Sequence, residues 1–567
     1  MAVCVGLPLL FVLLQGVAPG IGLSRDWRIQ PELLTEFGQR PLWQASLMNS
    51  LTLATGSMIL GGSLGSVLAL MRHSTQFFGA RLLDIVVWTL LVSPSFILAQ
   101  GWVQFGSPSG VAQANFGIDI SSFLFSPLGL IVIMSLKDFP FAYLATSAAL
   151  HWNNRSLTDA AALSGARQTT ILRTIRLPLV LPAVLSGWIL VFTDVIGDFG
   201  LPAALAARFS FPTLPYSIYA SVRQSPVNFA FGGVLSFYLV IIVLIATVIY
   251  LVLLQKAQHA FLNGEAVPQQ LPPARRSWVW SSIAALVTLT SLGIPIGTSL
   301  QVAITKTTHR GLELSNFTAE HFVEVFGAGS RMLDGLWNSV WIALIAALVT
   351  TVLGFLIATV LTFSSFKAKG VIDFAATITL AVPGIVLAVG YIFVWNQPVL
   401  SDLGVGLYGT PLLLILIGVA SALPVSIRLQ IGALTHISPN LLQAAALSGV
   451  GMWQRLRSIL VPLAFPAVIS AFAAVMASSV FDLAGTTMLA PPNFMTLPVE
   501  ILAEYDRGRF GYASAGALLS MGVVVMLAVA SDWIGSHLTR TATERTTSTR
   551  PRSDTAQEVT TLEKVTA

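Results

Sequence analysis

Three aspartates stand where long apolar stretches end, and their chemistry suits contact with a cation. Asp194 and Asp198 close such a stretch in the first half of the chain, and Asp482 closes one in the second half. An ionisable residue inside or at the edge of a membrane span costs about 2.5–3.5 kcal/mol at a helix centre, so it marks a functional position. Carboxylate oxygens suit hard metal cations. Capping of helix starts, or hydrogen bonding where the two halves meet, is the alternative role for these aspartates.

Other reactive residues lack the spacing that catalysis or metal binding requires. Cys4 is the single cysteine, which excludes an intrachain disulfide and a thiolate metal site. The seven histidines show no ligand spacing, and none of the six lysines lies in a GxxxxGK[ST] phosphate loop. Lys137 and Asp138 adjoin Pro140, and we expect them to neutralise one another. We therefore predict no catalytic residue, no resident metal and no cofactor.

The composition places these residues in a membrane. The chain has 567 residues, of which 55% are hydrophobic and 10% charged, and its mean hydropathy is +0.79. A soluble domain carries about 25% charged residues, and a span needs about 20 apolar ones. The sequence predicts an all-α, polytopic membrane protein of about 12 helices. We expect these near 1–22, 46–71, 82–105, 123–150, 179–205, 228–254, 278–304, 338–363, 371–396, 408–434, 463–485 and 513–535.

The basic residues favour one orientation. With both termini in the cytoplasm, cytoplasmic segments hold nineteen of the 30 lysines and arginines, in agreement with the positive-inside rule. The apolar segment 1–22 contains no lysine or arginine, so it lacks the basic region of a signal peptide. We expect a retained first helix, with a cleaved signal or a misplaced start as the alternatives.

An internal repeat organises the chain. Motifs of the first half return in the same order at offsets of 289, 284 and 283 residues. The matched pairs are Asn49-Ser50 with Asn338-Ser339, Asp84 with Asp373, Pro94 with Pro383, Gly101 with Gly390, Pro140 with Pro424, AAALSG at 160–165 with 444–449, Asp198 with Asp482, and Thr213-Leu214-Pro215 with Thr496-Leu497-Pro498. Six helices per half give two parallel repeats, and the transport path is expected between them.

The repeat also predicts domain boundaries. We expect a first lobe at 1–254, a polar cytoplasmic linker at 255–277, a second lobe at 278–535 and a disordered cytoplasmic tail at 536–567.

The strongest local motif is a cytoplasmic loop before the fifth span of each half. The segments read DAAALSGARQTTILRTIRLPLVLPAV at 159–184 and QAAALSGVGMWQRLRSILVPLAFPAV at 443–468. Three alanines favour helix and have little bulk, while Gly165 and Gly449 stand where a left-handed cap would end that helix. Pro178 and Pro462 stand where a new helix can start. Such an exposed helix–turn–helix is suited to a partner protein.

This loop resembles the EAA motif of ABC importer permeases. The matching residues are Asp159, Ala160, Ala161, Gly165, Ile175, Leu177 and Pro178 in the first half, and Gln443, Ala444, Ala445, Gly449, Ile459, Val461 and Pro462 in the second. Asp or Gln replaces the leading Glu, and Val461 replaces Leu, so an ion pair from Gln443 is excluded. The resemblance implies a type I permease fold in which each loop docks in a cleft of a separate ATPase subunit, two copies of which form a homodimer.

Nearly the whole chain is similar to the fused permeases of ferric-iron importers. The similar stretches are Asp198-Phe199-Gly200, FPTLPYSIY at 211–219 and DLAGTTMLAPPNFMTLPVEIL at 482–502. This resemblance implies an inner-membrane location and an extracytoplasmic substrate-binding protein. Thiamine, polyamine and aminoethylphosphonate permeases are built similarly, so those substrates stay open.

Two other classes compete with a primary-transport permease. A parallel repeat alone would permit an ion-coupled secondary transporter, but the twin loops and the scarcity of buried acids and bases argue against it. A membrane-embedded enzyme lacks a supporting cluster of His, Asp or Glu. The formal charge of +5 is modest and does not indicate nucleic-acid binding.

Overall fold

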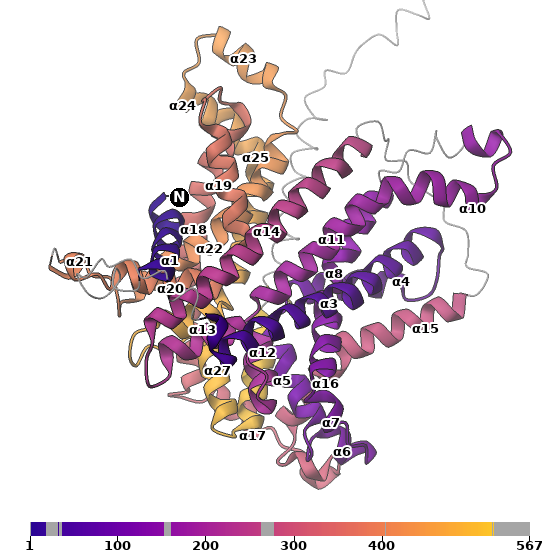
Figure 1. Cartoon of the computed structure of the whole chain (residues 1–567), viewed down its shortest axis with the longest axis vertical. Helices are drawn as coiled ribbons and strands as arrows, with labels where there is room; N and C mark the ends of the chain where they lie inside the picture. The colour runs from indigo at the N-terminus through magenta and orange to yellow at the C-terminus, as the bar shows by residue number, and fades with distance from the viewer. Residues whose placement is uncertain are drawn as a thin grey trace, which may run out of the picture.

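The computed structural model contains helices and no β-strand in the residues that it describes, which are 2–18, 32, 37–151, 160–261, 277–402, 404–523 and 525–526 (Figure 1). The predicted all-α membrane architecture is confirmed. The predicted tail 536–567 and residues 262–276 of the predicted linker lie outside the described residues.

Within the described residues, each half contains six apolar segments. In the first half they are α1 (Leu7–Val17, after a π-helical turn at Ala2–Gly6), α3 (Pro41–Ser74), α4 (Ala80–Val92) with α5 (Ser95–Gly106), α8 (Pro127–His151), α11 (Leu177–Gly197) and α14 (Phe229–Phe261). In the second half they are α15 (Ser277–Thr288) joined by a π-helical turn (Leu289–Gly293) to α16 (Ile294–Ile304), α18 (Arg331–Phe363), α19 (Lys369–Ala381) with α20 (Gly384–Trp395), α22 (Pro411–Leu434), α25 (Val461–Val480) and the helix Phe510–Val523.

Short helices connect these segments. They are α6 (Val111–Phe116), α7 (Ser121–Leu124), α10 (Gln168–Ile171), α12 (Gly200–Leu205), α13 (Leu214–Arg223), α17 (Glu320–Val325), α21 (Pro398–Asp402), α23 (Pro439–Leu447), α24 (Met452–Arg455), α26 (Leu483–Leu489) and α27 (Leu497–Asp506).

The helix count agrees with the predicted number of spans. Among the described residues, eight helices are long and apolar enough to cross a membrane, and the bent pair α4–α5 makes a ninth. Three shorter apolar helices, Cys4–Val17, Gly384–Trp395 and Phe510–Val523, occupy the remaining predicted positions. The eight long helices have 21 to 34 residues, which is adequate because a span needs about 20 residues at a rise of 1.5 Å each.

Several predicted boundaries were wrong, and proline or a cap explains most of them. The segment expected at 82–105 is two helices bent by 107° at Ser93-Pro94, because proline disfavours helical geometry in the residue before it. The repeat partner Pro383 separates α19 from α20 in the same way. The span expected at 179–205 ends at Gly197, and the one expected at 463–485 ends at Val480. Helix α14 continues to Phe261, so the first residues of the predicted linker are helical.

The first helix of each half packs against the other half. Helix α1 lies against α20, and α16 lies against α5. The repeated glycines permit this approach: a Cβ at Gly390 would lie 2.6 Å from the Pro8 carbonyl oxygen, and a Cβ at Gly101 would lie 2.4 Å from that of Pro295. Small residues at such crossings let helix backbones meet within a membrane. The two lobes are therefore interlocked reciprocally.

The repeated Asn-Ser pair performs the same task twice. Ser50 accepts a hydrogen bond from the Leu214 N–H at 2.7 Å, and Ser339 accepts one from the Leu497 N–H at 2.9 Å. The neighbouring Asn49 donates to the carbonyl of Pro212 at 3.0 Å. Each pair thereby holds the start of a short helix, α13 or α27, against the long second span of its lobe.

Candidate functional site

The two loops that resemble the EAA motif have the same backbone cap. In the first, the N–H groups of Gly165 and Ala166 donate to the carbonyls of Ala162 and Ala161, each at 3.0 Å. In the second, Gly449 and Val450 donate to Ala446 and Ala445, also at 3.0 Å. This pair of bonds defines a Schellman motif. The predicted left-handed caps are confirmed, because φ is +81° at Gly165 and +78° at Gly449.

The face presented by each cap is small and apolar. Leu163 and Leu447 are each 90% exposed, and helix α23 has no buried residue. Ala160 and Ala444 are also exposed, while Ala161 and Ala445 are half-buried. The same leucine is thus exposed beside small alanines at equivalent positions of both lobes, and the alanines would let a partner backbone approach closely. In Figure 1, α23 stands at the top of the view and α10 at its upper right, far from α6 and α17 at the bottom.

The helix after each loop starts earlier than predicted. Pro178 and Pro462 are the second residues of α11 and α25, but a π-helical turn directly precedes each helix, at Leu172–Arg176 and Leu456–Leu460. A proline ring clashes with the carbonyl four residues before it, and a π-helical turn relieves that clash by widening the ring of hydrogen bonds. The helix that contains Pro178 therefore begins at Gln168, and the helix that contains Pro462 begins at Met452.

The remaining motif residues follow this symmetry only in part. Ile175 and Ile459 are half-buried, Leu177 is exposed, and its counterpart Val461 is half-buried. Gln443 is exposed at the second loop, whereas Asp159 lies outside the described residues.

Sequence reasoning missed two features of the second loop. Ser438 caps α23 by accepting a hydrogen bond from the Asn440 N–H, and Arg455 donates to the Leu442 carbonyl at 3.3 Å, which braces α23 against α24. Met452 and Trp453 are 64% and 72% exposed beside them. The Ser438-Pro439 pair was a readable signal, because Ser at the N-cap followed by Pro commonly starts a helix.

Asp198 and Asp482 lie at the equivalent break after the fifth span of each lobe. Asp198 accepts hydrogen bonds from Ser95 and from the Gly200 N–H, both at 2.8 Å, so it ties the start of α12 to the start of α5. Asp482 accepts from the Gly485 N–H at 2.9 Å and caps α26. The second lobe has Gly384 where the first has Ser95, so among the described residues Asp482 has only local partners.

The third candidate, Asp194, belongs to an ionic group that the sequence only partly predicted. Lys137 contacts Asp138, as expected, at 2.6 Å, and it also contacts Asp194 at 2.6 Å. Asp138 is fully buried, and the Lys137 side chain is 14% exposed. The second partner comes from α11, 57 residues along the chain, and no sequence motif signals that distance.

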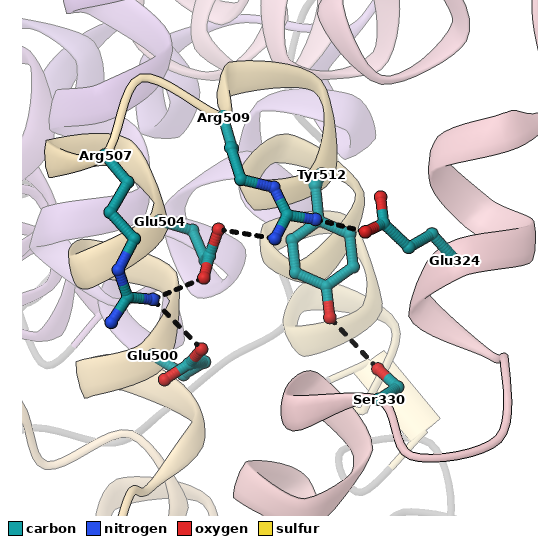
Figure 2. A network of polar contacts seen from close by, with 7 residues as sticks. All are labelled: Glu324, Ser330, Glu500, Glu504, Arg507, Arg509 and Tyr512. Carbon is teal, nitrogen blue, oxygen red and sulfur yellow. Dashed lines mark hydrogen bonds and ion pairs between the residues drawn. The ribbon is translucent and has the colours of Figure 1, made fainter.

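A further ionic network lies beyond the long helices, around α27 (Figure 2). Arg507 pairs with the buried Glu500 at 3.4 Å and with the buried Glu504, while Arg509 pairs with Glu504 and with Glu324. Burial raises the pKa of Glu500, and the hydrogen bond to Glu504 raises the pKa of Arg507. The network fastens α27 to α17.

Figure 2 also shows Arg509 over the ring of Tyr512, whose hydroxyl lies 3.0 Å from that of Ser330. The first lobe has no such network, because Ser217, Ser221 and Gln224 occupy the positions equivalent to Glu500, Glu504 and Arg507. The i, i+4 spacing of the two glutamates was visible in the sequence, but nothing indicated that both would be buried.

A cavity of about 700 Å³ lies beside this network, between the two lobes. Its lining includes Gln104 and Arg208 of the first lobe and Lys306, His321 and Arg509 of the second. Arg208 and Lys306 are exposed. Cationic side chains therefore outnumber Glu324, the acidic residue of the lining.

Known proteins match both lobes. Residues 42–260 and 350–540 match the family described as "Binding-protein-dependent transport system inner membrane component". The ferric transport system permease protein FbpB of Actinobacillus pleuropneumoniae is 24% identical over 86% of this chain and 71% of its own length. A second such relative, FbpB 2 of Haemophilus influenzae, is 23% identical over 90% of this chain and 92% of its own.

A shorter relative matches one half. The putative 2-aminoethylphosphonate permease protein PhnV of Salmonella paratyphi A is 25% identical over 45% of this chain and 94% of its own length. The family match covers both segments that contain the capped loops. The chain therefore belongs to the binding-protein-dependent inner-membrane transport components, and it is a multi-pass permease subunit of an ABC importer.

Proposed function

We propose that this permease imports ferric iron. The observation that carries the proposal is the pair of aspartates Asp198 and Asp482, which the fold places at the break after the fifth span of each lobe. Carboxylates suit Fe(III), which prefers oxygen ligands. The FbpB relatives, named for ferric transport, match most of the chain and support the same substrate. Asp194, Asp198 and Asp482 line or gate the path in this proposal.

The energy comes from a separate ATPase, because no lysine of the sequence lies in a phosphate-binding loop. The two capped loops dock on two copies of that subunit, a homodimer. Leu163 and Leu447, which are 90% exposed, are the side chains best placed to enter its clefts. The residues matched to the EAA motif on both sides form this coupling surface, and the chain itself has no enzymatic role.

The orientation follows from the same assignment. The coupling loops face the cytoplasm, and both termini lie on that side. A binding protein delivers the substrate to the opposite face, where α27 and the cavity lie. Lobes at 1–254 and 278–535, a cytoplasmic linker and a cytoplasmic tail complete the organisation.

Aminoethylphosphonate is the second candidate substrate, because the cavity lining is cationic. Arg208, Lys306 and Arg509 are among its lining residues, and guanidinium and ammonium groups bind phosphonate oxygens well. The PhnV relative, named for this compound, covers one half of the chain.

Uptake by cells with and without the gene decides between the two. Under iron limitation, loss of radiolabelled Fe(III) uptake in the deletion, restored by the gene, would support ferric iron. Unchanged iron uptake together with lost aminoethylphosphonate uptake would refute iron and favour the second candidate.

A further inference from the structure

Lys137 occupies a position that resembles a cation site. Its Nζ lies 2.6 Å from the Asp138 Oδ1 and 2.6 Å from the Asp194 Oδ2. Hard cations bind carboxylate oxygens at about 2.0–2.6 Å. The ammonium therefore stands where such an ion would have two carboxylate ligands, one from α8 and one from α11.

This group adjoins the boundary between the lobes. Asp194 lies one helical turn before Gly197, and a Cβ at Gly197 would lie 3.1 Å from the ring of Pro383 in the second lobe. Residues three apart share a helix face, so Asp194 lies on the face of α11 that carries Gly197, and its side chain contacts Lys137 of α8 in the same lobe. Its side chain is 34% exposed. An ion moving between the lobes could reach it there.

Two buried oxygens nearby have acceptor capacity left. The Oδ2 atoms of Asp138 and Asp198 are buried and have no hydrogen-bond partner among the described residues. An orphaned buried oxygen costs the desolvation free energy of the group, and the described residues contain others, among them the Oε2 atoms of Glu500 and Glu504. The Oδ2 atoms of Asp138 and Asp198 each remain able to bind a further ligand.

The second lobe lacks this arrangement. The repeat places Ser421, Ala422 and Ser478 where the first lobe has Lys137, Asp138 and Asp194. The hydroxyls of Ser421 and Ser478 donate within their own helices, to the carbonyls of Gly418 and Val475. Packing of the shared fold therefore does not require the ions, and their presence in one lobe indicates a separate task.

We propose that Lys137, Asp138 and Asp194 form a cation site at the lobe boundary, and that the Lys137 ammonium is its resting occupant. During transport a multivalent cation displaces the ammonium from Asp194, and the ammonium returns when the cation leaves. The tethered charge prevents the site from retaining the cation. The transport step rests on the proposed function, whereas the site itself does not.

The test measures binding of terbium(III) alone, by its luminescence, to the purified full-length chain in lipid nanodiscs. Lys137→Met removes the resident ammonium, and we expect terbium affinity at least tenfold above that of the unaltered chain. The double variant Lys137→Met with Asp194→Asn should lose that gain. Where the Met variant is not recovered folded, Lys137→Ser, which copies the second lobe, replaces it.

Arg72→Met is the matched control. It also removes the cation of an ion pair, since Arg72 contacts Asp84 at 2.9 Å, but among the described residues Arg72 pairs with this carboxylate alone. This variant should gain no tight terbium site. An equal gain from Arg72→Met, no gain from Lys137→Met, or a gain that survives Asp194→Asn overturns the proposal.

The proposed function is tested separately, by iron uptake through the unaltered chain. Terbium binding that follows the prediction, with no iron uptake, refutes iron as the substrate and leaves the cation site standing. Iron uptake by the unaltered chain, with no gain of terbium affinity in Lys137→Met, supports iron as the substrate and refutes the cation site.

Discussion

The Schellman caps at Gly165 and Gly449 allow a quantitative test of coupling. A Cβ at either glycine would meet no atom within 4 Å, so replacement by alanine adds no steric clash inside the permease. The change acts through the backbone alone, because φ is +81° and +78° at these positions. A left-handed conformation costs an ordinary L-residue about 1–2 kcal/mol.

That cost sets the expected loss of affinity for the ATPase. If the ATPase binds the capped conformation, two alanines together cost about 2–4 kcal/mol, which is roughly a 30- to 700-fold increase in Kd at 1.4 kcal/mol per factor of ten. Asparagine tolerates the left-handed region better than other side chains. The double Gly→Asn variant should therefore retain most of the affinity that the double Gly→Ala variant loses.

The assay titrates the purified ATPase subunit against each variant in nanodiscs. Size-exclusion profiles of the permease variants without ATPase serve as the control, and we expect them to match the profile of the unaltered chain. Replacement of both glycines by leucine, which adds bulk on the exposed face, should abolish docking altogether. Equal affinities for the Ala variant and the unaltered chain would refute the reasoning, and so would a loss in the Asn variant as large as in the Ala variant.

Three further predictions test other parts of the account. Leu163→Asp with Leu447→Asp should weaken ATPase binding at least tenfold and change permease stability by no more than about 0.5 kcal/mol, since both leucines are 90% exposed; thermal unfolding beside a binding titration checks this. Gly101→Ala should destabilise the chain by about 1–3 kcal/mol, because its Cβ would lie 2.4 Å from the Pro295 carbonyl, whereas Gly297→Ala, with no atom within 4 Å, should not. Ser339→Ala should cost about 1–3 kcal/mol by leaving the Leu497 N–H without its acceptor, and chemical denaturation can measure it.

The repeat made much of the fold predictable. Several recurring motifs have a structural cause that the two lobes share: Gly101 and Gly390 admit a helix from the other lobe, and Ser50 and Ser339 hold a short helix. Residues that two halves retain at a fixed offset are the ones whose geometry recurs. The left-handed caps were predictable for the same reason, because Gly165 and Gly449 end equal helices.

The helix breaks and the ionic groups were harder to predict from the sequence. Apolar periodicity does not distinguish one span from two bent helices, so Pro94 was the sole signal for the 107° bend between α4 and α5. Lys137 and Asp194 meet only because α8 and α11 pack together, and Glu504 is buried only because α27 folds back on the second lobe. Long-range contacts of this kind depend on tertiary packing that no local pattern reports.

The central claim is that each loop of one permease chain contacts its own copy of a separate ATPase. Site-specific cross-linking tests this claim most directly. Cys4 is the single cysteine, so a Cys4→Ser background can carry Leu163→Cys, Leu447→Cys or both. The account predicts one ATPase copy joined to the chain through either cysteine, and two copies joined through both. A double variant that never joins more than one copy, or ATPase that joins neither position while it still supports uptake, would contradict it.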